Sequence, residues 1–140
     1  MTTAIEAEAK SSRRLGRSIL ALLSGFVVNV GLSAATDIAL HVVGILPEMG
    51  RSMNNSQSLI ALSYRTAYGI IGSYFVARLA PHKPMKHALT GAAIGMVLAS
   101  AGAVATWDKG LAPQWYAVSL IAVALPTGWA GAKLWSMTSR

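Results

Sequence analysis

Residues 87–106 read HALTGAAIGMVLASAGAVAT, a run that contains no Asp, Glu, Lys or Arg. As a helix with a rise of about 1.5 Å per residue, this run covers about 30 Å, which matches the hydrocarbon core of a bilayer. Its apolar residues do not alternate as they would in a strand of a membrane barrel. The run therefore predicts a helix that crosses a membrane.

Three further segments of similar length have the same apolar character. They are residues 18–40, 59–79 and 115–134. The short connections between these segments favour antiparallel neighbours. We therefore expect an all-α fold, a bundle of four transmembrane helices that runs up-down-up-down. A polar basic segment (1–17) precedes this transmembrane domain (18–135), and residues 136–140 form a short tail.

The composition of the whole chain also indicates a membrane protein. Of its 140 residues, 54% are hydrophobic and only 12% are charged, whereas about a quarter of the residues of a soluble domain are charged. This apolar content excludes intrinsic disorder for most of the chain. Because there is no Cys, a disulfide framework, a Cys-ligated metal site and thiol catalysis are excluded.

Positive charge is concentrated on one side of the expected bundle. The chain has 12 Lys and Arg against 5 Asp and Glu, a net charge of +7. Nine of the 12 lie in the N-terminal segment, around the connection between the second and third spans, and at the C-terminus. Cytoplasmic segments of membrane proteins carry such an excess, so we expect both termini in the cytoplasm. The lipid bilayer, and not a nucleic acid, is the partner that this charge predicts.

The first apolar segment is longer than a bilayer requires. It continues beyond Leu40 to Leu46, where Pro47 ends it. From Leu15 to Leu46 a single helix would be about 47 Å long. Such a helix must tilt, bend or protrude at one end. The residues before Arg17 are too polar to insert, and we expect the start of the chain to fray.

Two ionisable side chains of opposite charge lie inside the expected spans. Arg65 is in the second span, and Asp37, near the outer end of the first, is the only acid in any span. A lone Arg at the centre of a bilayer costs about 2.5–3.5 kcal/mol, and less toward the interface. Because the two residues lie at similar depths, we predict that they meet between the first two helices. The pair either fixes the register of these helices or belongs to a substrate or ion site.

His41 lies one helical turn beyond Asp37 and shares its face of the helix. Two ligands at this spacing are only part of a zinc site, which needs a third protein ligand. The sequence places no third ligand beside them, so we expect no metal and no other cofactor.

Small and polar residues predict how the helices pack. Asn29 lies in the middle of the first span, where a buried Asn commonly bonds to a neighbouring helix; contact with a ligand is the less favoured alternative. Pro126 lies midway along the fourth span and predicts a kink. Small residues recur along the third span and predict close contact with another helix, inside the bundle or across a dimer. They are Gly91, Gly95, Ala99 and Gly102.

Three short runs of the chain carry a resemblance to other sequences. They are Tyr64-Arg65-x-x-Tyr68-Gly69-x-x-Gly72, Ala77-Arg78-Leu79-Ala80-Pro81 and Pro84-Met85-Lys86-His87-Ala88. Over roughly residues 60–135 the chain resembles small four-span proteins known from bacterial genomes only as hypothetical membrane proteins. This resemblance implies a location in the bacterial inner membrane and no assigned activity. The size is also that of a small multidrug exporter, but that family has a Glu inside its first helix, and here only Asp37 stands in for it, nearer the helix end.

The residues do not suggest an enzyme. There is no nucleophile–base set, no carboxylate pair and no phosphate-binding loop. We therefore favour a structural or accessory membrane subunit without enzymatic activity, in a homo-oligomer or a larger assembly. The alternative is a small transporter or channel that uses the region of Asp37, Arg65 and His41.

Overall fold

The chain folds into helices only. A computed structural model describes all residues 1–140. One turn of 3-10 helix, η1 (Trp107–Lys109), follows the third of four α-helices. The α-helices are α1 (Thr2–Val42), α2 (Asn55–Leu79), α3 (Pro84–Thr106) and α4 (Gln114–Thr138). The all-α fold with four long helices is thereby confirmed.

Local sequence determines where the helices begin. The side chain of Asn54 accepts a hydrogen bond from the backbone N–H of Gln57 (2.9 Å), and the Gln57 side chain accepts one from the Asn54 N–H (3.0 Å). This reciprocal capping box starts α2. Pro84 lies in the first turn of α3. Backbone N–H groups have no hydrogen-bond partner within the helix there, so a residue without an N–H costs nothing. After α1, Gly44 turns the chain with a φ of 77°, a conformation that favours glycine.

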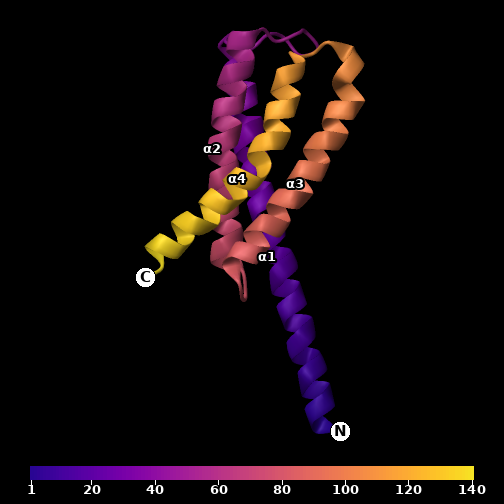
Figure 1. Ribbon diagram of the computed structural model, residues 1–140, viewed down its shortest axis with the longest axis vertical. Coiled ribbons are helices and arrows are strands. Elements are labelled where there is room, and N and C mark those ends of the chain that lie inside the picture. Colours follow the sequence, from indigo (N-terminus) through magenta and orange to yellow (C-terminus); the bar gives the residue numbers. More distant parts are fainter.

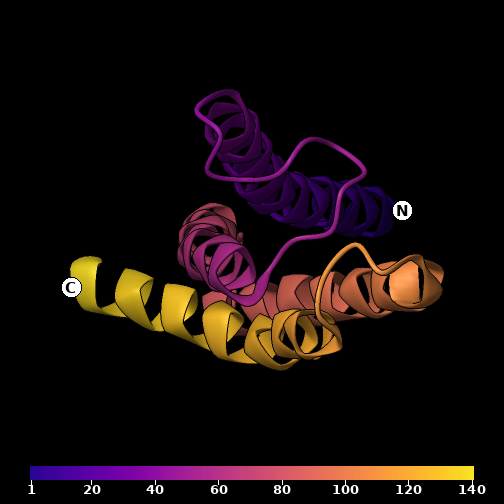
Figure 2. The ribbon, with the colours of Figure 1, turned by 90° about the horizontal axis from the view of Figure 1, so that it is seen from above.

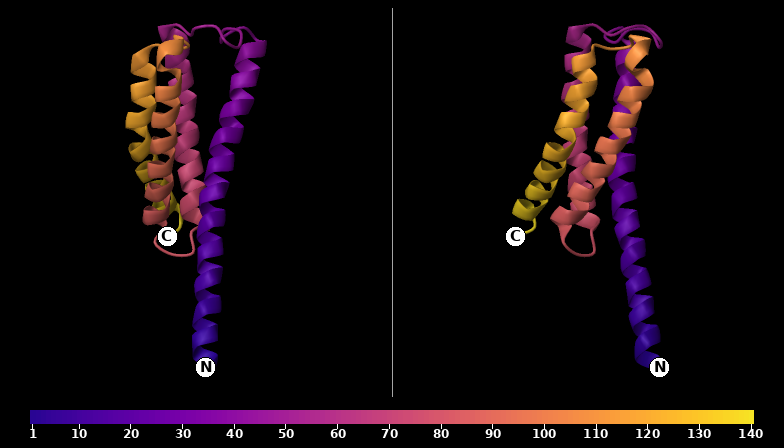
Figure 3. Two further views of the ribbon diagram at one scale, coloured as in Figure 1. Left: turned by 90° about the vertical axis from the view of Figure 1, so that its right-hand side faces the viewer. Right: turned by 45° about the vertical axis from the view of Figure 1, so that its right-hand side comes forward.

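Consecutive helices run in opposite directions (Figure 1). Both termini therefore lie toward the end of the bundle that carries the α2–α3 connection (Figures 1 and 3). We call the opposite end, with the α1–α2 and α3–α4 connections, the distal end. The central helix is α2, because it packs against α1, α3 and α4. Seen from above, it lies between α1 and the α3–α4 pair (Figure 2).

Three of the four helices are long and apolar enough to cross a membrane: α1, α3 together with η1, and α4. Large apolar side chains such as Val27, Val97 and Val118 are exposed, whereas the buried residues are mostly alanine and glycine. Soluble proteins bury their large apolar side chains. Membrane bundles instead pack small residues together and leave the large ones to the lipid. The surface is therefore that of a membrane protein.

The fourth span that we expected, residues 59–79, is covered by α2, but this helix is not among the three with a sufficiently apolar window. Tyr64, Arg65 and Tyr68 make its middle polar. The other helices pack around α2, and the side chains of Tyr64, Arg65 and Tyr68 are partly buried there. Its position at the centre of the bundle explains why its hydropathy is low.

The first helix is about twice as long as a bilayer is thick. Its 41 residues extend over about 62 Å, against about 30 Å for the hydrocarbon core. The N-terminal part protrudes well beyond the other helices (Figures 1 and 3). We expected the start of the chain, residues 2–10, to fray, but the helix begins at Thr2. Ala, Glu, Lys and Arg dominate this stretch, and they favour helix even without a packing partner.

The fourth helix changes direction about halfway along its length (Figure 1), and Pro126 lies within it. Proline lacks the N–H for the helical hydrogen bond and clashes with the preceding turn, which explains the bend. Beyond the bend, glycines bring α4 against its neighbours. A Cβ on Gly128 would lie 2.5 Å from the Ala92 Cβ, and one on Gly131 would lie 2.5 Å from the Ile70 carbonyl oxygen.

Candidate functional site

Asp37 and Arg65 meet between α1 and α2. Nη2 of Arg65 donates a hydrogen bond of 2.7 Å to Oδ2 of Asp37. The Arg65 and Asp37 side chains are 36% and 26% exposed, so the pair is only partly shielded from its surroundings. Hydrogen bonds in which both groups are ionised are short and strong. The structure thus brings together the two residues whose depth in the spans predicted a contact.

Tyr64 is the third member of this contact. Its hydroxyl donates to Oδ1 of Asp37, so both carboxylate oxygens are engaged. One turn further, the hydroxyls of Tyr68 and Thr36 share a hydrogen bond of 2.8 Å. We did not predict this role of Tyr64. The sequence does carry a signal for it. Tyr64 and Tyr68 are one helical turn apart on α2, and they face the neighbouring residues Thr36 and Asp37 of α1.

Arg65 retains unused hydrogen-bond donors. Its side chain makes one hydrogen bond, to Asp37, although a guanidinium carries several N–H donors. Its Nε is buried without a partner, and so is the hydroxyl of Tyr116, a residue that is only 7% exposed. Buried polar groups in proteins are nearly always hydrogen-bonded. Arg65 therefore keeps N–H groups without a partner in the chain, although its Nε and the Tyr116 hydroxyl are themselves buried.

His41 contacts the backbone of this cluster. Its Nδ1 lies 2.5 Å from the carbonyl oxygen of Asp37. Because a carbonyl only accepts, Nδ1 is the donor, and Nε2 alone is left for another partner. No three His, Cys, Asp or Glu side chains come together as a potential metal site. His41 is thus a neighbour of the ion pair on its distal side.

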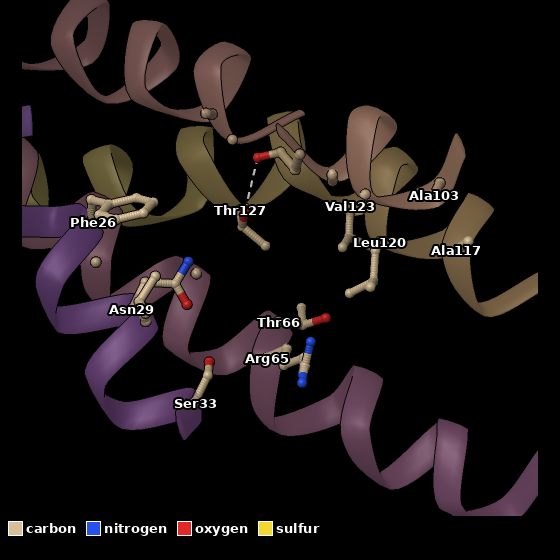
Figure 4. Close-up of a pocket in the computed structure, with 18 of the residues that line it drawn as sticks. Phe26, Asn29, Ser33, Arg65, Thr66, Ala103, Ala117, Leu120, Val123 and Thr127 are labelled. Atoms are coloured by element: carbon tan, nitrogen blue, oxygen red, sulfur yellow. Dashed lines mark hydrogen bonds between the residues drawn. The ribbon is translucent and has the colours of Figure 1, made fainter. Parts of the chain in front are cut away.

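A cavity of about 900 Å³ lies between the helices, and Asp37 and Arg65 form part of its wall. Figure 4 shows Asn29, Ser33 and Arg65 on one side of this space and Leu120 and Val123 of α4 on the other. Cavities of about 300–1,000 Å³ hold drug-sized molecules. The size suits a small organic molecule better than a single ion.

The side of the cavity formed by α1 is polar. Asn29, Ser33 and Asp37 follow one another at every fourth residue and all line the cavity. Side chains at this spacing share one face of a helix, here over about 12 Å. We expected Asn29 to bond to a neighbouring helix, but its side chain lies against Gly72 and forms no hydrogen bond with the residues around it (Figure 4). The amide faces the cavity instead, which favours the alternative of contact with a ligand.

The side formed by α3 consists largely of its small residues. They were expected to pack closely, but a Cβ on Gly95 or Gly102 would meet no atom within 4 Å. Only Gly91 has a near neighbour, since a Cβ there would lie 3.3 Å from Leu22 Cδ2. Beyond this contact α1 diverges from α3 toward the distal end (Figure 3), so the small residues leave space within one chain. Four of them line the cavity: Gly91, Gly95, Ala99 and Gly102.

A second space, of about 200 Å³, lies at the distal end. It is lined by His41, Tyr64 and residues 46–51 of the α1–α2 connection, among others. Four residues line both this distal space and the larger cavity: Asp37, Met53, Arg65 and Leu111. The ion pair therefore stands in the wall that the two spaces have in common.

Comparison with known proteins identifies no relative from which a function could be transferred. No protein family, curated protein or solved structure matches the chain. The resemblance to hypothetical bacterial membrane proteins stays a prediction. The cavity and the ion pair in its wall are therefore the basis for inferring a function.

Proposed function

We propose that the protein crosses the bacterial inner membrane four times, with both termini in the cytoplasm. Three helices have the necessary length and apolarity, and α2 packs among them, so it is embedded with them. Both termini lie toward one end of the bundle (Figure 1). The segments that contain nine of the 12 Lys and Arg also belong to that end. An excess of Lys and Arg marks the cytoplasmic side of a membrane protein.

Within this membrane, we propose that the protein is a small transporter or channel and not an enzyme. The observation that carries this proposal is the place of Asp37 and Arg65 in the wall between the cavity and the distal space. Ionisable residues within a membrane are costly and commonly mark the path of a substrate or ion. A pair that only fixes helix register requires no cavity beside it. Separation of Asp37 from Arg65 and Tyr64 would join the two spaces into one route.

A structural or accessory subunit is the second candidate, and a different observation favours it. Residues 1–17 are exposed throughout, although residues 2–17 form a continuous part of α1. A helix that protrudes without a partner in its own chain offers a surface to another protein. This role would place the chain in a homo-oligomer or a larger membrane assembly.

Flux into proteoliposomes distinguishes the two candidates. The full chain is reconstituted, and proton flux is followed with an entrapped pH-sensitive dye, while entry of glycerol is followed by light scattering. Transport predicts flux above that of protein-free vesicles, and a changed flux in Asp37→Asn and Arg65→Gln. Tyr74→Phe, on α2 but outside both spaces, is the control that should keep the wild-type rate. Wild-type protein that is helical by circular dichroism but carries neither proton nor glycerol contradicts a channel for protons or small polyols and favours the accessory role.

A further inference from the structure

We infer that the cavity binds an uncharged amphiphile, a molecule with oxygen acceptors along one edge and an apolar face on the other. This inference rests on the proposed function, because it names the class of molecule that the same cavity would carry. Three properties of the lining support it: its net charge, its unused donors and its apolar side.

The charges in the lining of the cavity cancel. Asp37 and Arg65 are its only Asp, Glu, Lys, Arg or His residues, and they pair with each other at 2.7 Å. A charged ligand would add an uncompensated charge to a space enclosed by helices and lipid. Transfer of such a charge out of water costs far more than one new hydrogen bond returns. The lining therefore selects a neutral molecule.

Polar groups without a protein partner line the α1 and α2 side of the cavity, and N–H donors are among them. Arg65 has N–H groups without a protein partner, and its side chain is 36% exposed. Asn29 and Ser33 turn their polar atoms toward the same space from α1 (Figure 4). Both oxygens of Asp37 are already occupied, by Arg65 and Tyr64. Hydroxyl, carbonyl or ether oxygens are the neutral groups that accept from such donors.

The facing side offers apolar contact. Leu120 and Val123 of α4 point into the cavity opposite Asn29 and Arg65 (Figure 4), and Ile94 of α3 lines it as well. Gly95 and Ala99 also line the cavity, and their small size leaves space beside these side chains. A molecule with only polar groups would leave part of its own hydrogen-bonding capacity unmet on this side. The occupant is therefore amphiphilic.

Photolabelling in nanodiscs with three matched probes tests the inference. The probes share a decyl chain that carries a diazirine and differ in the head group: an alcohol, a carboxylate and a trimethylammonium. Gly95→Leu places a bulky side chain in the cavity, because Gly95 lines the cavity and a Cβ there meets no atom within 4 Å. Gly31→Leu is the matched control, since Gly31 is equally open on α1 but does not line the cavity. Labelled residues are identified by mass spectrometry.

The alcohol should label cavity residues of the wild type and of Gly31→Leu at least about tenfold more than those of Gly95→Leu, a ratio that corresponds to the loss of a specific site. The carboxylate and the trimethylammonium should label equally weakly in all three proteins. Labelling by the carboxylate that equals labelling by the alcohol, or alcohol labelling that Gly95→Leu leaves unchanged, overturns the inference. Preferential alcohol labelling by a protein without flux refutes transport but not the ligand class. If the protein shows flux but all three probes label it equally, the ligand class is refuted and transport is not.

Discussion

Gly25 of α1 and Gly72 of α2 touch backbone to backbone. A Cβ built on either glycine would lie 2.7 Å from the carbonyl oxygen of the other, closer than real Cβ atoms approach. Both residues also line the cavity. The contact is thus the point from which α1 diverges from its neighbours, and it sets the width of the space beyond.

A larger residue at this crossing should destabilise the bundle. We expect Gly25→Val to lower the free energy of unfolding by about 1–3 kcal/mol, because the backbone of α2 cannot yield as a side chain can. Gly31→Val, on the same helix with no atom within 4 Å of its added Cβ, should have little effect. Unfolding in mixed detergent–SDS micelles, followed by circular dichroism, measures both. Equal losses in the two variants would show that the crossing is not tightly packed.

The ion pair should show coupling between its two members. Asp37→Asn and Arg65→Gln each leave one charge without its partner, and we expect each to cost about 1–3 kcal/mol of unfolding free energy. The double variant removes both charges, so its loss should be smaller than the sum of the single losses. The same unfolding assay applies. A double variant whose loss equals the sum of the two single losses would refute the pairing.

The hydroxyl of Tyr64 should contribute to stability, whereas that of Tyr74 should not. Tyr64→Phe removes a donor to Asp37 and should cost about 1 kcal/mol. Tyr74 has only a long, exposed contact of 3.4 Å with Thr138, so Tyr74→Phe should leave the unfolding curve unchanged. If Tyr64→Phe also leaves it unchanged, Asp37 is held by Arg65 alone.

Narrowing the cavity with one bulky side chain should reduce flux without loss of the fold. In proteoliposomes we expect Gly95→Leu to reduce solute entry below the wild-type rate, while Gly31→Leu keeps the wild-type rate. Both changes place leucine at a helical glycine with open space around it, and leucine is the better helix former. Circular dichroism should therefore show a helical content at least as high as in the wild type. Undiminished entry through Gly95→Leu would mean that the route avoids the cavity.

The chain has no native cysteine, so single cysteines report topology directly. In spheroplasts, a membrane-impermeant maleimide should label Glu48→Cys and should label Ser11→Cys and Ser139→Cys only after the membrane is permeabilised. All three positions are exposed in the fold. The excess of Lys and Arg near the termini gives this direction. Labelling of Ser11→Cys and Ser139→Cys in intact spheroplasts would invert the orientation.

Much of the helical architecture and the contact between Asp37 and Arg65 can be predicted from the sequence. Long apolar runs have few ways to fold in a membrane, and two opposite charges at one depth have few partners other than each other. The start of α1 was less predictable, because residues 2–17 have helix propensity but no packing partner that an apolar pattern would reveal.

The cavity could not be predicted, because it depends on which glycines meet. Gly91 and Gly95 form the more regular small-residue pattern, yet the contact between two glycines of different helices joins Gly25 to Gly72, whose surroundings are less regular. The spacing of small residues shows that one face of a helix is flat. It does not show which neighbouring helix packs against that face. The role of Asn29 could not be predicted for the same reason, since it depends on whether space or a helix lies opposite.

The unbroken first helix is also a spacer of fixed length. From Thr2 to Arg17 it rises about 22 Å, as one continuous piece with the part that packs against α2. Anything joined to the amino terminus is held at that distance from Arg17 and turns with the wall of the cavity. A small change in the tilt of α1 at the cavity would displace the amino terminus much further than it displaces the cavity wall, because the helix is continuous between them.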